Sequence, residues 1–195
     1  EKLELLDIEG TGEDGRVTLA DVKDAVAEKP QTFSTMRKII AQRLTQSKQQ
    51  IPHFYVTVSI DLTDLMEKRA KLKAEGINLS VNVFIVKAVA LALKKFPMMN
   101  SVTDGVTYKY KSKINIGVAV SMPNGLVVPE IRNADKKALD EIQAETADYA
   151  DKARSGKISP DDLKGGTFTI SNMGMMNVEN FCAIINPGEA AILAV

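Results

Sequence analysis

The spacing of apolar residues changes along the chain, and each change predicts a different element. Residues 36–44 place apolar side chains three and four positions apart, which indicates a helix. Residues 54–60 alternate apolar and polar side chains, which predicts a strand with one buried face. Helices are expected at 62–76 and 80–96. The second is apolar nearly all round, so we expect it to be buried on most sides.

The second half of the chain is rich in predicted strands. Alternation at 106–110 and 114–120 is followed by a turn at 123–125 and a returning strand at 126–128. A helix capped by Asp135 and closed by Gly156 comes next, then a helix start at Ser159-Pro160-Asp161, a strand at 167–171 and an apolar run at 190–195. This mixed order, with few βαβ units, predicts an α+β layered domain. Because the apolar run would leave a bare strand edge, we expect the natural domain to continue past Val195.

The first thirty residues form a separate unit. A polar turn at 10–16 precedes Thr18, which stands at an N-cap position with Asp21 three residues later, close to a capping box. The helix expected at 19–27 has too few apolar residues to fold alone. We therefore expect an incomplete module at 1–28, a linker at 29–33 and a second domain at 34–195.

Charge and composition exclude several classes of function. The chain has 25 basic and 25 acidic residues, and this balance argues against nucleic acid as a partner. No apolar run reaches the roughly 20 residues that span a bilayer, so no membrane partner is expected. Cys182 and His53 are the only residues of their types, so we expect no disulfide and no metal site. Cys182 is expected to be a buried, inert thiol in a reducing compartment.

Four motifs occur in a fixed order, at residues 34–55, 115–129, 165–172 and 185–187. Together they resemble the dihydrolipoamide acyltransferase components of 2-oxo-acid dehydrogenase complexes, and 181–187 is most similar to the acetyl-transferring, pyruvate-complex branch. Residues 1–27 resemble the second half of that family's peripheral subunit-binding domain. The resemblance implies a chloramphenicol-acetyltransferase-like layered domain with a mixed sheet, preceded by a partial small helical subunit-binding domain.

The implied reaction moves an acyl group, expected to be acetyl, from dihydrolipoamide to coenzyme A. Coenzyme A and the lipoyl group are then substrates, and no metal is needed. A thiol with a pKa near 8.5 is mostly protonated at neutral pH, so a base helps. The family's His-Arg-x-x-Asp-Gly motif does not occur in these 195 residues. We therefore expect the catalytic histidine to be absent and residues 1–195 alone to be inactive, and we expect His53 to be structural.

The resemblance assigns Ser171 to stabilise the oxyanion from the neighbouring subunit, where the alternative is a serine that caps a strand. It implies that Ser121, Asn124 and Asn172 lie near the substrate channel and bind coenzyme A. Lys111 and Lys113 could attract the phosphates of coenzyme A or form a solvated face. Arg16 could pair with acidic groups of a partner subunit or be a plain exposed arginine.

The expected partners are two further copies, in a homotrimer within a larger cage, and the dehydrogenase and dihydrolipoamide dehydrogenase subunits, through the N-terminal module. The expected compartment is the bacterial cytoplasm or the mitochondrial matrix. Two alternatives remain: a non-catalytic core and recruitment subunit, and a chloramphenicol-acetyltransferase-like enzyme. The second is disfavoured by residues 1–27, because such enzymes carry no subunit-binding arm.

Overall fold

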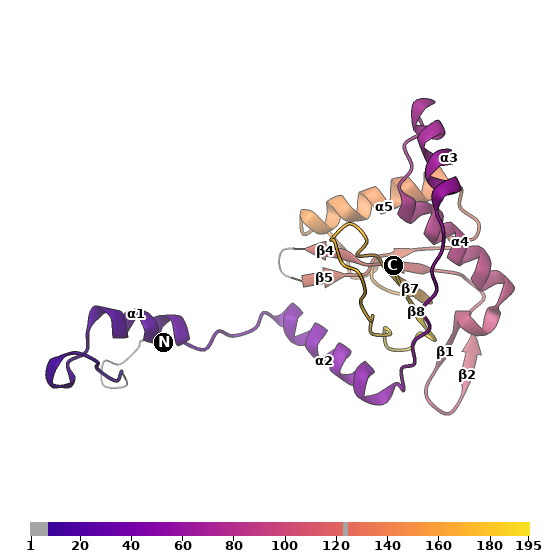
Figure 1. Ribbon diagram of the computed structural model, residues 1–195. Coiled ribbons are helices and arrows are strands. Elements are labelled where there is room, and N and C mark those ends of the chain that lie inside the picture. The colour runs from indigo at the N-terminus through magenta and orange to yellow at the C-terminus, as the bar shows by residue number, and fades with distance from the viewer. Residues whose placement is uncertain (1–7, 123–124) are drawn as a thin grey trace. The chain divides into compact units, whose positions relative to one another are not determined.

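The computed structural model of the chain describes residues 8–122 and 125–195 (Figure 1). The chain divides into two compact units, Glu1–Thr35 and Met36–Val195. Asn124, one of the residues predicted to bind coenzyme A, lies outside the described residues. None of the helices in the described part of the chain is long and apolar enough to cross a bilayer.

The elements follow one another in a mixed order. The helices are η2 (Glu13–Gly15), α1 (Leu19–Glu28), α2 (Thr35–Gln50), α3 (Thr63–Ala74), α4 (Val81–Lys95), η3 (Pro97–Asn100) and α5 (Leu139–Arg154), where η marks a 3₁₀ turn. The strands are β1 (Ser101–Thr103), β2 (Tyr108–Tyr110), β3 (Ile116–Val118), β4 (Val120–Met122), β5 (Gly125–Val127), β6 (Glu130–Ile131), β7 (Phe168–Ser171) and β8 (Ile192–Ala194).

In the first unit, the carboxylate of Asp21 organises the start of α1. The predicted capping box is confirmed: Asp21 N donates to Thr18 Oγ1 at 3.3 Å, and Thr18 N donates to the Asp21 carboxylate at 2.7 Å. Thr11 donates to the same carboxylate through its hydroxyl (2.7 Å) and its backbone N–H (3.0 Å). These bonds, led by the one from the Thr11 hydroxyl, hold the pKa of Asp21 well below its usual value.

The second unit is built on a mixed four-stranded sheet. Its strand order is β6-β3-β7-β8, with β3, β7 and β8 parallel and β6 antiparallel to β3. Helices α4 and α5 pack against one face of this sheet and form the core with it (Figure 1). The fully buried side chains there include Val83 and Val86 of α4, Ile142 of α5, Ile116 of β3 and Ile170 of β7. The predicted α+β layered domain with a mixed sheet is therefore confirmed.

The predicted central hairpin is also confirmed. Strands β4 and β5 pair antiparallel, with Val120 opposite Val127 and Met122 opposite Gly125. The alternation at 106–110 gives the short strand β2, which pairs with β1. Helix α4 is less enclosed than its sequence predicts, because Leu91 on its outer side is 50% exposed. Only one side of α4 is buried in the core, and not most of its circumference as predicted.

Four further predictions are wrong. Residues 54–60 do not pair with any strand of the described residues, and Phe54 and Val56 are 85% and 77% exposed. Ser159 begins a turn and not a helix. Its N–H and its hydroxyl donate to the Asp162 carboxylate, and the N–H of Asp162 donates to the Oγ of Ser159. Helix α5 begins after Ala138 rather than Asp135. Cys182 is exposed, although its neighbours Phe181 and Ala183 are half-buried and line a cavity.

Candidate functional site

Ser171 is the last residue of β7 and lies at the carboxyl end of the parallel strands. Its carbonyl oxygen accepts a hydrogen bond from Val195 N at 2.9 Å, so the backbone at this position is fixed by its neighbour strand. The side chain is half-buried and lines a mostly apolar cavity of about 220 Å³, together with Leu44, Leu126, Phe181 and Ile192. In residues 8–122 and 125–195, no group hydrogen-bonds to its hydroxyl, which is free to donate to a ligand.

The turn after Ser171 is held by the side chain of Asn172. Its Nδ2 donates to Asn82 Oδ1, near the start of α4, at 3.3 Å, and its Oδ1 accepts from Gly174 N at 2.9 Å. Met173 N donates to the carbonyl oxygen of Val195 at 2.8 Å. These contacts fix the direction in which the chain leaves β7, and so they help to set the position of Ser171.

His53 and α2 hold one wall of the cavity. Ile185 N donates to His53 Nε2 at 3.0 Å, and the carbonyl oxygen of Ile185 accepts from the Ser47 hydroxyl. Because Nε2 is an acceptor, the ring proton lies on Nδ1, which is 2.7 Å from the carbonyl oxygen of Ile51. Both ring nitrogens are thus occupied by backbone groups, as expected of a structural histidine. The segment they hold, residues 181–187, supplies several cavity-lining residues.

The other residues singled out from the sequence are scattered. Ser121 is exposed on β4, opposite Leu126, which lines the cavity. Lys111 and Lys113 are exposed and precede the amino end of β3. Since Ser171 lies at the carboxyl end of β7, parallel to β3, the structure does not bring these lysines to Ser171 within one chain. Arg16 is exposed in the first unit.

The sequence reasoning missed two buried carboxylates, Glu130 on β6 and Glu189 just before β8, which are 2% and 5% exposed. The pKa of Glu130 is raised to about 8, mainly by burial and then by the negative charge of Glu189. The positive charge of Arg132 lowers it by a smaller amount. Burial also raises the pKa of Glu189, although its oxygens accept hydrogen bonds from Thr169 Oγ1 (2.7 Å) and Asn186 Nδ2 (2.9 Å). The available signal was Glu130 itself, a charged residue inside the apolar run 126–131.

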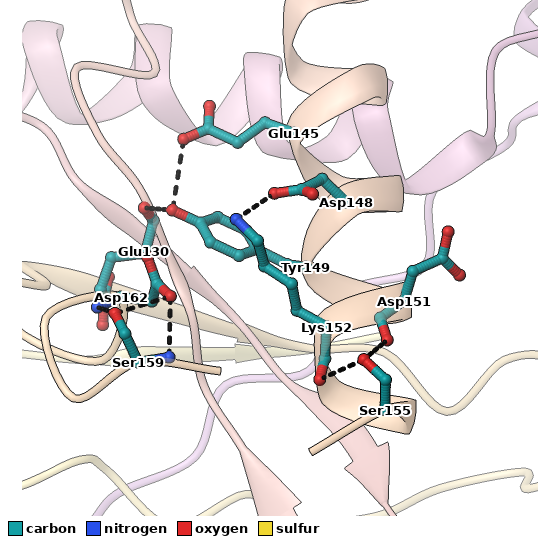
Figure 2. A network of polar contacts seen from close by, with 9 residues as sticks. All are labelled: Glu130, Glu145, Asp148, Tyr149, Asp151, Lys152, Ser155, Ser159 and Asp162. Atoms are coloured by element: carbon teal, nitrogen blue, oxygen red, sulfur yellow. Dashed lines mark hydrogen bonds and ion pairs between the residues drawn. The ribbon is translucent and has the colours of Figure 1, made fainter. Parts of the chain in front are cut away.

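The backbone of Glu130 is anchored to α5, as Figure 2 shows. The Tyr149 hydroxyl lies 3.3 Å from the carbonyl oxygen of Glu130 and 3.5 Å from Glu145 Oε1. Burial and the carboxylates of Glu145 and Asp162 raise the pKa of Tyr149 to about 12, so the phenol keeps its proton. This contact ties the β6 backbone to the helical layer.

The described residues contain no group of three or more His, Cys, Asp or Glu side chains that could hold a metal ion. The site offers the chemistry of a serine hydroxyl beside an apolar cavity, with a pair of buried carboxylates nearby.

Residues 25–195 match the family model of the 2-oxoacid dehydrogenases acyltransferase (catalytic domain). The chain is 39% identical, over 99% of its length and 47% of the relative's, to the dihydrolipoyllysine-residue acetyltransferase component of the mitochondrial pyruvate dehydrogenase complex of Schizosaccharomyces pombe. It thus spans about half the length of that relative.

The chain is also similar to solved structures, of which two are described. A probable dihydrolipoamide acetyltransferase from Listeria monocytogenes matches with a TM-score of 0.81 and 39% identity, covering 87% of this chain and 75% of the other. The cubic core of the pyruvate dehydrogenase multienzyme complex matches with a TM-score of 0.81 and 37% identity, covering 85% and 71%.

Proposed function

Because the chain belongs to the family of 2-oxoacid dehydrogenase acyltransferase catalytic domains, we propose that it transfers an acetyl group from dihydrolipoamide to coenzyme A. The observation that carries the proposal is the free hydroxyl of Ser171 at the mouth of an apolar cavity. A cavity with this lining suits the alkyl parts of the lipoyl and pantetheine arms.

In the proposed step, the sulfur of coenzyme A attacks the thioester carbonyl of acetyl-dihydrolipoamide. A tetrahedral intermediate forms, the carbonyl oxygen becomes an oxyanion, and the dihydrolipoamide sulfur then leaves and takes up a proton. The Ser171 hydroxyl donates a hydrogen bond to the oxyanion, and one such donor contributes about 3 kcal/mol. As the resemblance implies, we propose that Ser171 of one subunit stabilises the oxyanion that forms in the active site of the neighbouring subunit.

The base that deprotonates coenzyme A is not His53, because its ring nitrogens bond to Ile51 and Ile185. We assign the base to a histidine of the His-Arg-x-x-Asp-Gly motif, which is not among these 195 residues. For coenzyme A, we propose contacts with Ser121, Asn124 and Asn172, and attraction of its phosphates by Lys111 and Lys113 of another subunit. The step as we propose it uses no metal ion.

We also propose that the protein assembles as trimers within a larger core. Residues 54–60 support this, since the side chains of Phe54, Val56, Val58 and Ile60 are 71–85% exposed in the single chain. Arg16 would serve the N-terminal module in binding the dehydrogenase and dihydrolipoamide dehydrogenase subunits. Relatives from a mitochondrion and a bacterium make the mitochondrial matrix or bacterial cytoplasm the proposed compartment.

Substitution of Ser171 in the intact protein tests the proposal. We expect Ser171→Ala to lower kcat about a hundredfold in acetyl transfer from acetyl-dihydrolipoamide to coenzyme A, with little change in KM, because the contact forms mainly in the transition state. Ser155→Ala, an exposed serine after α5, is the matched control. An unchanged kcat would reduce Ser171 to a strand cap, and no turnover by the parent protein would favour a non-catalytic core subunit.

A further inference from the structure

A second and larger cavity, of about 500 Å³, lies beside the one that Ser171 lines. Among the residues that the structure describes, the two share only Asn186 as a lining residue. The larger cavity lies toward the amino ends of β7 and β8, and its wall carries both buried carboxylates, Glu130 and Glu189. Its volume is within the range of about 300–1,000 Å³ typical of small-molecule sites. The acyltransfer proposed above gives it no role.

The carboxylate of Glu130 lies across the sheet on the side away from α4 and α5. Its neighbour in register on β3 is Gly117, and the next residue across, on β7, is Thr169, which bonds to Glu189. A Cβ at Gly117 would lie 3.2–3.3 Å from the Glu130 oxygens, and a Cβ at Gly166 would overlap Oε1. Because Gly117 and Gly166 have no side chains, there is space for the Glu130 carboxylate between them.

One oxygen of that carboxylate lacks a partner. Within residues 8–122 and 125–195, no group hydrogen-bonds to the buried Oε2 of Glu130. A buried oxygen without a donor destabilises the folded protein, and a second carboxylate close by adds repulsion when both are ionised. Arg132 does not relieve this, since its guanidinium donates to the carbonyl oxygens of Asp161 and Lys164. Among the described residues, Oε2 of Glu130 is therefore left without a hydrogen-bond donor.

The remaining lining indicates which cation fits. A bare metal ion is far smaller than 500 Å³, and the described residues place only two carboxylates here, too few for a metal cluster. Val102, Leu163 and Pro187 give the cavity apolar wall, which suits an organic body. Arg43 of α2 adds a positive charge to the same wall, and that charge would oppose a simple amine.

We infer that this cavity binds a small organic zwitterion of the amino-acid class, with its ammonium group on Glu130 and its carboxylate on Arg43. The ammonium supplies the missing donor to Oε2 and neutralises the acid pair. The carboxylate pairs with the Arg43 guanidinium, which matches carboxylates in geometry. Leu163 and Val102 contact the carbon chain between the two charges.

Three probes of matched length test the inference by titration calorimetry on the intact protein: 5-aminopentanoate, pentylamine and pentanoate. We expect 5-aminopentanoate to bind at least tenfold more tightly than either of the others. Binding should also tighten about fiftyfold from pH 6 to pH 8, because the ammonium displaces the proton that Glu130 holds below its pKa of about 8. The binding heat should therefore differ between buffers of different ionisation enthalpy, and this difference measures the number of protons released.

Three variants locate the site. Glu130→Gln should weaken binding of 5-aminopentanoate at least tenfold and abolish its pH dependence, whereas Glu67→Gln, an exposed glutamate on α3, should change neither. Arg43→Ala should remove the preference for 5-aminopentanoate over pentylamine. Leu163→Trp fills the cavity from its rim and keeps the test valid if Glu130→Gln folds poorly. The inference is overturned if the parent binds none of the probes at millimolar concentration, or if binding survives in both Glu130→Gln and Leu163→Trp.

Discussion

Glu130 and Ser171 occupy the same face of the central sheet but differ in what surrounds them. The Ser171 hydroxyl is uncharged and opens onto a cavity at the end of β7. The Glu130 carboxyl is enclosed beside Gly117 and Gly166, near a second carboxylate. A residue that is costly to bury when ionised makes stability depend on pH.

The pH dependence follows from the pKa of Glu130, which burial raises from 4.5 to about 8. The folded protein holds a proton that the unfolded chain releases, so this stabilisation is fully present below pH 4.5 and is lost as the pH rises to about 8. Glu130→Gln removes the effect. Between pH 5 and pH 8, we expect the free energy of unfolding of the variant to rise relative to that of the parent by about 1 kcal/mol per pH unit.

Urea unfolding at each pH measures this difference, with Glu67→Gln as the control. A constant difference between Glu130→Gln and the parent across this range would show that Glu130 titrates normally in the folded protein.

At the scale of elements, glycines set where two helices end. Gly76 follows α3 with a φ of +85°, and Gly156 follows α5 with a φ of +68°. A side chain at Gly156 would meet no other atom within 4 Å, so the requirement there is conformational and not steric. This left-handed position lets Gly156 N and Lys157 N donate back to carbonyl oxygens of the last turn of α5.

Substitution at Gly156 isolates this conformational cost. We expect Gly156→Ala to lower the free energy of unfolding by about 1 kcal/mol, because alanine is strained at positive φ. Gly156→Asn should lose less than half as much, since asparagine tolerates this region. Thermal and urea unfolding of the three proteins give the comparison, and equal stability of the alanine variant would mean that the turn relaxes to another conformation.

At the scale of the whole molecule, residues 54–60 form a surface that the single chain does not cover. Phe54, Val56, Val58 and Ile60 stand at alternate positions of this segment and are 71–85% exposed. Apolar surface is stabilised by about 25 cal/mol for each Å² removed from water. A run of this kind therefore favours contact with another chain, in line with the proposed assembly.

Charged residues on this surface test that contact. We expect the double variant Val56→Lys, Val58→Lys of the intact protein to dissociate into smaller species, while the unfolding of each unit changes little, because neither valine packs in the core of the chain. Val106→Lys, at a 92% exposed turn position, is the matched control. Light scattering measures the mass, and an unchanged mass of the double variant would place the interface elsewhere.

The sequence by itself determined the elements whose signals are local. The capping box of Thr18 and Asp21, the hairpin that returns at Gly125 and the ends of α3 and α5 at glycines depend on residues within a few positions of each other. The helical spacing of α2 and the α+β order were readable for the same reason, since the period of apolar residues reports which face is buried. The four family motifs also placed Ser171 at a strand end.

Only the tertiary structure decided which predicted faces are covered. Residues 54–60 alternate as a strand does, yet pairing needs a second strand edge, and within this chain none of the described strands supplies one. Cys182 is exposed because apolar neighbours in sequence do not guarantee neighbours in space. Glu130 and Glu189 stand 59 positions apart, and Gly117 and Thr169 bring them together only once β6, β3 and β7 pair in register. The pairing of strands that are distant in sequence decides which side chains come together, and the local pattern of apolar and polar residues does not encode that pairing.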